Sequence, residues 1–140
     1  MKINPYLNFE GKAEEAFEFY KSVFGGEFSR IQRYSETPEA GEVKKEDQNK
    51  IMHVSLPVGD AILMASDSVD SMGQKLLTGN NISLSIDTGS KEEADQLFKA
   101  LSEGGKVDMP MDNSFWGSYF GMATDRFGIH WMISWDKDRM

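Results

Sequence analysis

The sequence predicts an α+β fold made of two βαβββ modules, which we expect to form a curved mixed sheet around a cavity. Two observations lead to this prediction: an internal repeat, and apolar residues that recur with strand and helix periods in each copy. The repeat pairs one helical motif and its closing glycines with a second set, namely Glu14-Glu15-Ala16, Tyr20-Lys21 and Gly25-Gly26 with Glu92-Glu93-Ala94, Phe98-Lys99 and Gly104-Gly105. The chain is therefore expected to be a single domain over residues 1–140, with a first module of about 1–70 and a second of about 78–140.

A cavity follows from the shape of the predicted module. One βαβββ module has a strongly curved sheet, and its single helix cannot fill the concave side. Two such modules can enclose a cavity between their sheets, which is where proteins place small-molecule sites.

The first strand and helix have the clearest patterns in the first module. Apolar residues over 3–9 predict a strand that stops at Glu10-Gly11. Apolar residues recur at helical spacing over 12–24, while the intervening residues are charged, so this segment predicts an amphipathic helix. Gly25-Gly26 suits the end of a helix, because glycine adopts positive φ without a Cβ clash.

The rest of the first module is expected to hold one irregular strand and a hairpin. Residues 27–35 predict the irregular strand, and the polar segment 36–50 predicts a mobile loop without a folded element. Residues 52–56 and 62–65 predict a hairpin, because each run is suited to a strand and a tight connection joins them. Residues 67–80 are expected to form a polar connection.

The second module repeats this plan. Alternating apolar residues over 82–87 predict a strand, and Ser90 with Glu93 forms a capping-box pattern at the start of a helix. The helix is expected to bury four apolar side chains and to end at Gly104-Gly105; they are Ala94, Leu97, Phe98 and Leu101. Residues 107–109 predict a strand cut by Pro110, and residues 118–123 and 129–135 predict the last pair of strands.

Composition and charge exclude several classes of function. The chain has no cysteine, which excludes disulfides, thiolate nucleophiles and cysteine-ligated metal sites. The net charge of -8 repels phosphate backbones and anionic lipids, so we expect neither nucleic acid nor membrane as a partner. No long apolar run and no signal-peptide pattern is present, which predicts a cytoplasmic location.

The motifs together resemble PhnB-like proteins of the vicinal oxygen chelate superfamily, which includes glyoxalase I, bleomycin-resistance proteins and extradiol dioxygenases. The resemblance covers nearly the whole chain, and its last motifs are the most specific: Tyr6 to Gly11, Ala13 to Ala16, Phe19-Tyr20, Phe24 to Gly26, Met52-His53, Leu63 to Asp67, Gly104 to Val107, Met109-Pro110, Phe115 to Gly117, Phe120-Gly121, Asp125 to Gly128 and Trp131. It implies a glyoxalase/bleomycin resistance/dihydroxybiphenyl dioxygenase-like fold and a homodimer. An older domain name for such proteins refers to 3-demethylubiquinone methyltransferase. That reaction would need an S-adenosylmethionine site, and the sequence shows no glycine-rich loop after a parallel-type strand.

Enzymes of the wider superfamily hold a divalent metal through His, Glu or Gln side chains. The resemblance places those positions, within about one residue, at Ile3 to Pro5, Leu63 to Ser66, Asn81 and Met132. None is a histidine or a carboxylate, and a neutral amide oxygen alone does not hold a transition metal. We therefore expect no metal and no cofactor.

The expected partner is a small-molecule ligand bound by residues from both modules. We expect an adaptable apolar wall from aromatic rings and flexible thioethers, with one polar histidine; the candidate ligand-binding residues are Tyr6, His53, Met64, Trp116, Phe120 and Trp131. The bland alternative is that most of these aromatic residues are ordinary core and that His53 is a structural histidine. We expect His130 to point away from Trp131, and Asp125-Arg126 to fix a turn rather than to act in catalysis.

The first hypothesis is thus a PhnB-like small-molecule binding protein that lacks the usual metal site. The second is a divalent-metal-dependent lyase, isomerase or dioxygenase with ligands outside the usual positions. The third is an antibiotic-sequestering resistance protein, because an acidic protein permits a cationic drug. The sequence identifies no catalytic residue, no reaction and no ligand.

Overall fold

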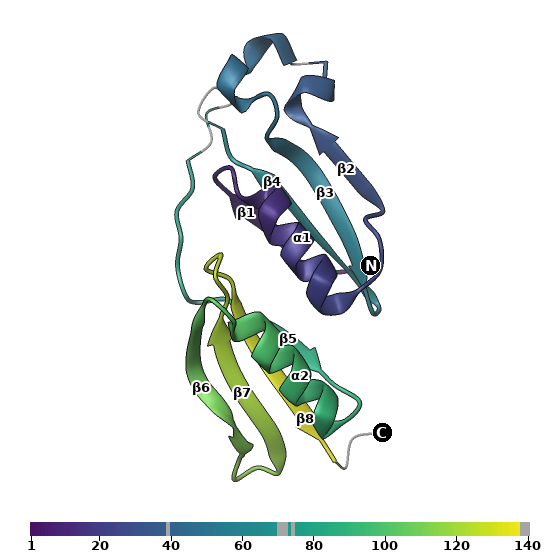
Figure 1. The fold of residues 1–140 in the computed structure, drawn as a ribbon, viewed down its shortest axis with the longest axis vertical. Coiled ribbons are helices and arrows are strands. Elements are labelled where there is room, and N and C mark those ends of the chain that lie inside the picture. Colours follow the sequence, from purple (N-terminus) through teal and green to yellow (C-terminus); the bar gives the residue numbers. More distant parts are fainter. Residues whose placement is uncertain (39, 70–72, 74, 138–140) are drawn as a thin grey trace. The chain divides into compact units, whose positions relative to one another are not determined.

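The computed structural model describes residues 1–137 except 39, 70–72 and 74. Its elements fall into two compact units, residues 1–78 and 79–140 (Figure 1). The first unit contains β1 (Tyr6–Phe9), α1 (Ala13–Phe24), β2 (Arg30–Arg33), β3 (Ile51–Val58) and β4 (Ala61–Asp67). The second contains β5 (Leu84–Asp87), α2 (Lys91–Ser102), β6 (Lys106–Asn113), β7 (Ser118–Thr124) and β8 (His130–Asp136).

Both units have the same sheet topology. The strand order is β1-β4-β3-β2 in the first sheet and β5-β8-β7-β6 in the second. In each sheet the first strand pairs in parallel with the last strand of its unit, and the other pairs are antiparallel. The predicted α+β class with two βαβββ modules is confirmed. That the two modules form one domain stays a prediction.

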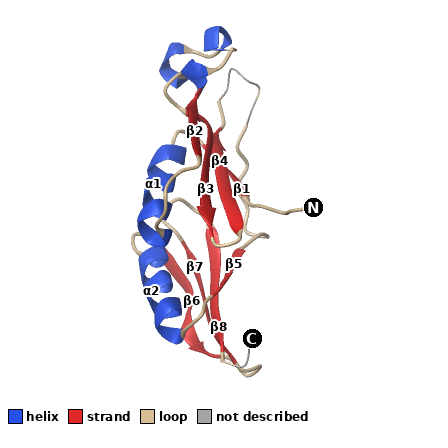
Figure 2. Ribbon diagram, turned by 90° about the vertical axis from the view of Figure 1, so that its right-hand side faces the viewer, coloured by secondary structure: helices blue, strands red, loops and turns tan. Residues whose placement is uncertain are grey.

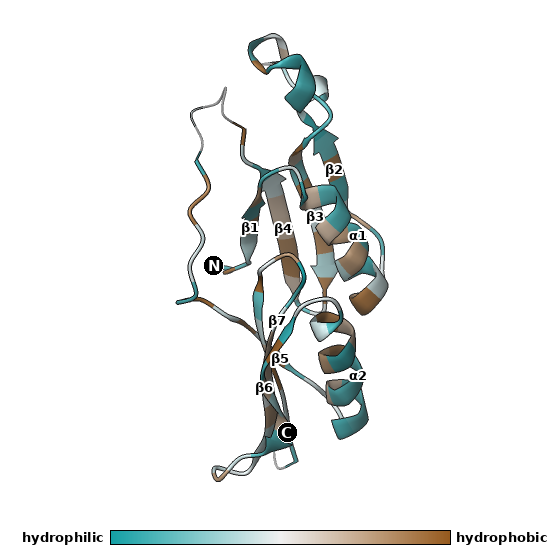
Figure 3. Ribbon diagram, turned by 60° about the vertical axis from the view of Figure 1, so that its left-hand side comes forward, coloured by the Kyte–Doolittle hydropathy of each residue, from teal (hydrophilic) through white to brown (hydrophobic). Residues whose placement is uncertain are grey.

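Each helix covers one face of its own sheet (Figure 2). Val54 and Ala65 lie on the covered face of the first sheet and are fully buried, as is Phe17 of α1. Most of β4 is apolar, as its brown colour in Figure 3 shows. The predicted end of α1 is confirmed, because Gly25 adopts φ 80° and its N–H donates to the carbonyl of Lys21. In the described part of each unit, the opposite face of the sheet carries no helix.

The predicted cap of α2 is also confirmed. The Glu93 N–H donates to Ser90 Oγ at 3.1 Å, and the Glu93 carboxylate accepts the Gly89 N–H at 2.9 Å. Fewer apolar side chains of α2 are buried than predicted. Ala94 and Leu101 are buried, whereas Leu97 and Phe98 are half-buried.

Substitution of Ser90 by alanine is expected to lower the free energy of unfolding by about 1 kcal/mol, because the Glu93 N–H loses its acceptor. Urea unfolding followed by circular dichroism measures the change. Ser102→Ala is the matched control, since Ser102 Oγ donates to the carbonyl of Lys99 at the far end of the helix and takes no part in the cap. Equal stability of the two variants would contradict the assigned cap.

Three predicted strands are longer than the strands in the structure. The strands predicted over 3–9 and 82–87 begin at Tyr6 and Leu84, and the one predicted over 27–35 spans only Arg30–Arg33. At the first of these starts, the Ile62 N–H donates to the side chain of Asn4 at 3.0 Å. A side chain therefore takes the place that a longer β1 backbone would occupy. The tight turn and hairpin predicted near residue 60 are confirmed by the antiparallel pairing of β3 and β4.

The prediction of a loop without folded elements over 36–50 is wrong. Three short 3₁₀-helices lie in or beside this segment: η1 (Tyr34–Glu36), η2 (Ala40–Glu42) and η3 (Lys45–Asp47). A small apolar cluster holds them, in which Tyr34, Val43 and Val69 are buried and Met52 packs alongside. Val43 is thus the apolar residue that anchors the polar segment 36–50 in this cluster. Part of the predicted connection 67–80, residues 70–72 and 74, lies outside the described residues.

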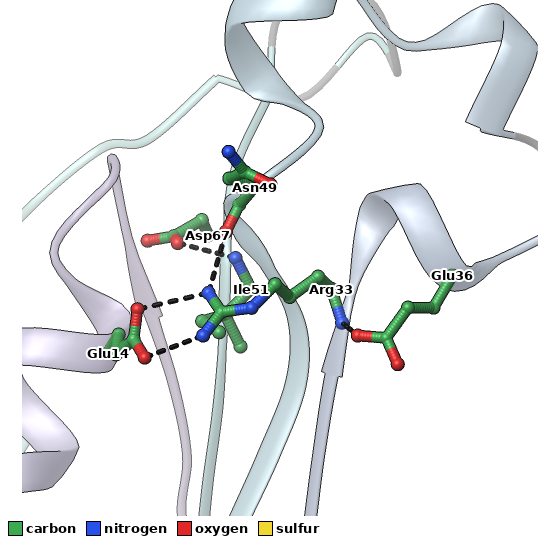
Figure 4. A network of polar contacts seen from close by, with 6 residues as sticks. All are labelled: Glu14, Arg33, Glu36, Asn49, Ile51 and Asp67. Atoms are coloured by element: carbon green, nitrogen blue, oxygen red, sulfur yellow. Dashed lines mark hydrogen bonds and ion pairs between the residues drawn. The ribbon is translucent and has the colours of Figure 1, made fainter.

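Arg33 ties this segment to α1 (Figure 4). Its guanidinium donates to both Glu14 carboxylate oxygens, at 3.0 and 2.7 Å, and to the carbonyl of Asn49 at 2.9 Å. Hydrogen bonding from Arg33 lowers the pKa of Glu14. A bidentate arginine–carboxylate contact fixes the orientation of the two side chains as well as the distance between them.

The strand predicted to stop at Pro110 instead continues to Asn113. β6 lies at the edge of its sheet, where proline can be accommodated because no neighbouring strand needs its missing N–H. The pairing with β7 is irregular on both sides of Met109. Among the described residues, no helix is long and apolar enough to cross a membrane.

Candidate functional site

Three of the predicted site residues lie on the helix-free face of the first sheet. Tyr6 is the register partner of Met64, and Met64 is the register partner of Ser55. His53 lies two residues from Ser55 on the same strand and therefore points to the same side. Strand order and side-chain alternation thus bring Tyr6, His53 and Met64 to one surface.

Tyr6 and His53 are in direct contact. The Tyr6 hydroxyl lies 3.2 Å from His53 Nδ1, and the two ring centroids are 5.7 Å apart. Burial lowers the pKa of His53, and the nearby positive charge of Arg30 lowers it further. The imidazole is therefore mostly neutral at pH 7 and can act as a hydrogen-bond partner without carrying charge.

Arg30 and Gln32 belong to this surface although sequence reasoning did not select them. Arg30 is the register partner of Ser55, and Gln32 is the partner of His53. Arg30 Nη2 donates to Gln32 Oε1 at 2.6 Å. The signal was present in the sequence, because Arg30 and Gln32 flank Ile31 with the period of a strand.

Two further predicted residues meet in the second unit. Trp116 and Phe120 stack edge to face with ring centroids 5.8 Å apart, and Phe115 packs on Trp116 at 5.0 Å. They line a pocket of about 370 Å³ beside β6, together with Met109, Pro110, Met111, Asp112, Asn113 and Ser114. Trp116 is 60% exposed and Phe115 97% exposed. Large aromatic rings this open to water are suited to being covered by a ligand or another surface.

Trp131 is placed differently from the other predicted residues. It is 3% exposed, and its indole N–H donates to Asp125 Oδ2 at 2.9 Å. Asp125 Oδ1 also accepts the N–H groups of Phe127 and Ile129, which confirms that Asp125 fixes the turn into β8. A ligand-binding role for Trp131 stays a prediction, and the contacts in the structure give it a structural one.

Comparison with known proteins identifies the family. The profile of the 3-demethylubiquinone-9 3-methyltransferase family matches residues 1–134. The chain belongs to this PhnB-like family. The match covers nearly the whole chain and confirms the resemblance seen in the motifs.

Solved structures agree with the family. Protein PA1353 from Pseudomonas aeruginosa is 40% identical, with 99% of each chain covered and a TM-score of 0.87. A putative 3-demethylubiquinone-9 3-methyltransferase, PhnB protein, from Bacillus cereus is 29% identical over 96% of this chain and 99% of that one, with a TM-score of 0.77. A glyoxalase/bleomycin resistance protein/dioxygenase family enzyme from Burkholderia phytofirmans PsJN shares the fold at 17% identity, covering 93% and 95% of the two chains, with a TM-score of 0.62.

The residues of this PhnB-like chain do not fit the metal site that the superfamily implies. The positions that correspond to metal ligands carry side chains such as Met64, Ser66 and Met132. Among the described residues, no group of three or more His, Cys, Asp or Glu side chains could hold a metal ion. Thioether and hydroxyl groups without a carboxylate or imidazole form a poor donor set for a divalent transition metal.

His130, the other histidine of the PhnB-like chain, is engaged in structural contacts. Its Nδ1 lies 2.9 Å from Thr124 Oγ1, and its Nε2 lies 3.2 Å from the carbonyl of Gly79. Thr124 Oγ1 donates to Asp108 at 2.6 Å. His130, Thr124 and Asp108 line a cavity of about 420 Å³. Its other lining residues are Asn80, Ser83, Lys106, Met122, Ala123 and Trp131. His130 thus fixes the start of the second unit to its sheet.

Proposed function

We propose that this PhnB-like protein binds a small organic molecule without a metal ion. The observation that carries the proposal is the pocket beside β6, in which Trp116 and Phe120 form an aromatic wall. Aromatic rings and the thioethers of Met109 and Met111 provide an adaptable apolar surface for a planar group. The volume of about 370 Å³ lies in the range of small-molecule pockets.

Within the first unit, the helix-free face of the sheet offers polar groups for a ligand. Tyr6 and His53 offer a neutral hydrogen-bonded pair, and Met64 lies next to Tyr6 in register. We propose Tyr6, His53 and Met64 as ligand contacts within the first unit, as Trp116 and Phe120 are within the second. Trp131 contributes by holding β8 in place through its bond to Asp125.

Methyl transfer is not the function that the loops support. In cofactor-binding α/β folds, free backbone N–H groups in a glycine-rich loop after a parallel strand meet the cofactor. Here the Gly11 and Ala13 N–H groups after β1 donate to Asp67, and the Gly89 N–H after β5 donates to Glu93. These donors already have partners in the protein.

Truncation of Trp116 to alanine is expected to weaken binding of the fluorescent dye anilinonaphthalene sulfonate about tenfold. The estimate follows from the loss of roughly 60 Å² or more of apolar contact, which corresponds to about 1.5 kcal/mol. Titration of the dye, read from its fluorescence, measures the change. Leu77→Ala is the matched control, because Leu77 is an exposed apolar side chain that does not line this pocket. Unchanged affinity in Trp116→Ala would remove the pocket from the proposal.

A divalent-metal lyase, isomerase or dioxygenase is the main rival. Metal analysis of purified protein with native His53 and with His53→Gln separates the two. A stoichiometric metal that disappears in the variant would overturn the metal-free proposal. Sequestration of a cationic drug is the other rival, and one feature favours it: among the described residues that line the aromatic pocket, Asp112 alone is charged. Calorimetric titration with bleomycin tests it, and no heat of binding at high concentration would remove it.

We also propose that the protein works as a homodimer. The superfamily resemblance supports this, since cavities in the superfamily are completed within one chain or across a dimer. Exposed apolar side chains, among them Ile3 and Ile82, are available for a partner surface. Light scattering of the purified protein gives the mass in solution, and a mass of one chain at micromolar concentration would contradict the proposal.

A further inference from the structure

The helix-free face of the first sheet carries a row of polar side chains in contact or in register. The row runs from Arg30 through Gln32 to His53, and the Tyr6 hydroxyl contacts His53 at the far end of the row. Arg30 and Gln32 come from the edge strand β2, His53 from β3 and Tyr6 from β1. We call Arg30, Gln32 and His53 the donor row, because of the hydrogen-bond groups that its contacts leave available.

The contact between Arg30 and Gln32 uses the acceptor of the glutamine. Arg30 Nη2 donates to Gln32 Oε1 at 2.6 Å, so the side-chain NH₂ of Gln32 remains as a donor. No described residue accepts a hydrogen bond from Nε or Nη1 of Arg30. These two side chains therefore offer mainly N–H groups to a ligand, because one hydrogen bond already occupies Gln32 Oε1.

The contact between Tyr6 and His53 has the same consequence. In the neutral tautomer in which the Tyr6 hydroxyl donates to Nδ1, the ring proton resides on Nε2. This tautomer is assigned as part of the inference, because the 3.2 Å contact fits either direction of donation. It makes Nε2–H a donor that is not used by any described residue.

The charges on this face match its donors. Strand register and alternation place ten residues on it, and Arg30 is the only charged one; the ten are Tyr6, Asn8, Arg30, Gln32, His53, Ser55, Pro57, Ile62, Met64 and Ser66. The chain as a whole carries a net charge of -8. A single cation among neutral donors is therefore a local exception to an acidic protein.

We propose that the ligand carries an oxyanion, such as a carboxylate, phosphonate or phosphate, and that the donor row binds it. The guanidinium of Arg30 supplies the charge and a fork of N–H groups, and the Gln32 amide and His53 Nε2–H complete the set. The inference rests on the proposed function, because it names the chemical class of the small molecule. Charge-assisted hydrogen bonds are about twice as strong as neutral ones, so the anionic group is expected to dominate recognition on this face.

The test compares benzoate with benzamide, which has nearly the same shape and no charge. Both compounds are titrated into the ¹⁵N-labelled full chain, and dissociation constants are taken from NMR shifts of residues near His53. Benzoate is expected to bind at least about tenfold more tightly than benzamide. In Arg30→Gln this preference is expected to disappear, because a charged hydrogen bond corresponds to roughly tenfold or more in affinity.

Matched variants separate the local effect of Arg30 from a change in net charge. Lys45→Gln removes one positive charge from an exposed site in the same unit, and it is expected to leave the benzoate constant within about twofold. Arg30→Lys keeps the charge but loses the fork, so an intermediate constant is expected. Arg30 is exposed, so its variants are expected to fold, and NMR spectra like that of the native chain are the check.

The titration of His53 gives a second readout that a merely structural Arg30 would not change. Bound benzoate is expected to raise the pKa of His53, because an adjacent anion favours the imidazolium form. Arg30→Gln without ligand is also expected to raise the pKa of His53, since one of the two causes of its lowering is removed. Burial remains, so the pKa stays below that of an ordinary histidine.

Each outcome decides the inference. Benzoate binding that requires Arg30 and shifts His53 supports it. Equal affinity for benzoate and benzamide, or equal affinity in Arg30→Gln, overturns the inference and leaves small-molecule binding in place. No shift with either compound at millimolar concentration also overturns it, while the dye titration with Trp116→Ala decides the proposed function separately.

Discussion

Replacing Asp67 with alanine is expected to lower the free energy of unfolding by about 4 kcal/mol. The carboxylate of Asp67 is 2% exposed and accepts three backbone N–H groups: Gly11 at 2.8 Å, Ala13 at 3.0 Å and Ile51 at 2.9 Å. These donors belong to the segment that enters α1 and to the start of β3, so one side chain at the end of β4 joins three elements. Figure 4 shows the contact of Asp67 with Ile51. Without the carboxylate, each buried N–H loses its partner at a penalty of roughly 1–3 kcal/mol.

Urea unfolding followed by far-ultraviolet circular dichroism measures the loss. Asp67→Asn is expected to lie between the native chain and Asp67→Ala, because the amide oxygen still accepts while the amide NH₂ faces a donor. Asp60→Ala is the matched control, since Asp60 is exposed in the turn between β3 and β4 and accepts no hydrogen bond from a described residue. A loss below about 1 kcal/mol in Asp67→Ala would show that water or neighbouring groups replace the carboxylate.

A methyl group added at Gly105 is expected to destabilise the second unit by about 3 kcal/mol. A Cβ at this position would overlap the carbonyl oxygen of Thr124 and lie 2.7 Å from the carbonyl carbon of Asp125. Both are backbone atoms, and three hydrogen bonds to the side chain of Asp125 hold that backbone in place. Overpacking against atoms that cannot move is among the more destabilising changes in a folded chain.

Gly41→Ala is the control for this substitution. Gly41 has no left-handed φ and no atom within 4 Å of an added Cβ, so its variant is expected to match the native midpoint of thermal unfolding. Gly105→Ala is expected to melt several degrees lower, as about 3 kcal/mol requires for a chain of this size. Equal midpoints for the two variants would contradict the close approach of the loop 103–105 to the start of the β7–β8 turn.

The fold could be predicted because it depends on patterns that extend over many residues. The helical spacing of apolar residues up to Gly25, and the alternation in the β3–β4 and β7–β8 hairpins, predict element types from period alone. The repeat then supplied the topology of two modules. Strand ends were less well predicted, because they depend on single hydrogen bonds such as that between Ile62 and Asn4.

Two errors have a common physical cause: local composition was overruled by tertiary context. A proline would break a central strand, so Pro110 predicted the end of a strand. The sequence does not say that β6 lies at the edge of its sheet, where proline is tolerated. The segment 36–50 looks too polar to fold, but Val43 packs with Tyr34, just before the segment, and with Val69, which lies beyond β4.

The placement of the candidate residues was predicted in part, and their role in binding stays a prediction. Tyr6, His53 and Met64 were expected as pocket residues, and the structure brings them to one face; it also brings Trp116 and Phe120 to one pocket. Arg30 and Gln32 were missed because their role depends on which groups their contacts leave available. That information exists only once the register of β2 against β3 is known.

Native mass spectrometry of the protein purified directly from cell extract tests the central claim most directly. The account predicts a mass above that of the polypeptide by the mass of one organic molecule per site, with no retained divalent metal. The fraction of protein that carries the bound molecule is expected to be lower in Trp116→Ala than in the native chain. A stoichiometric divalent ion that is lost in His53→Gln, or a bare polypeptide that also fails to bind the dye, would contradict a metal-free small-molecule binding protein.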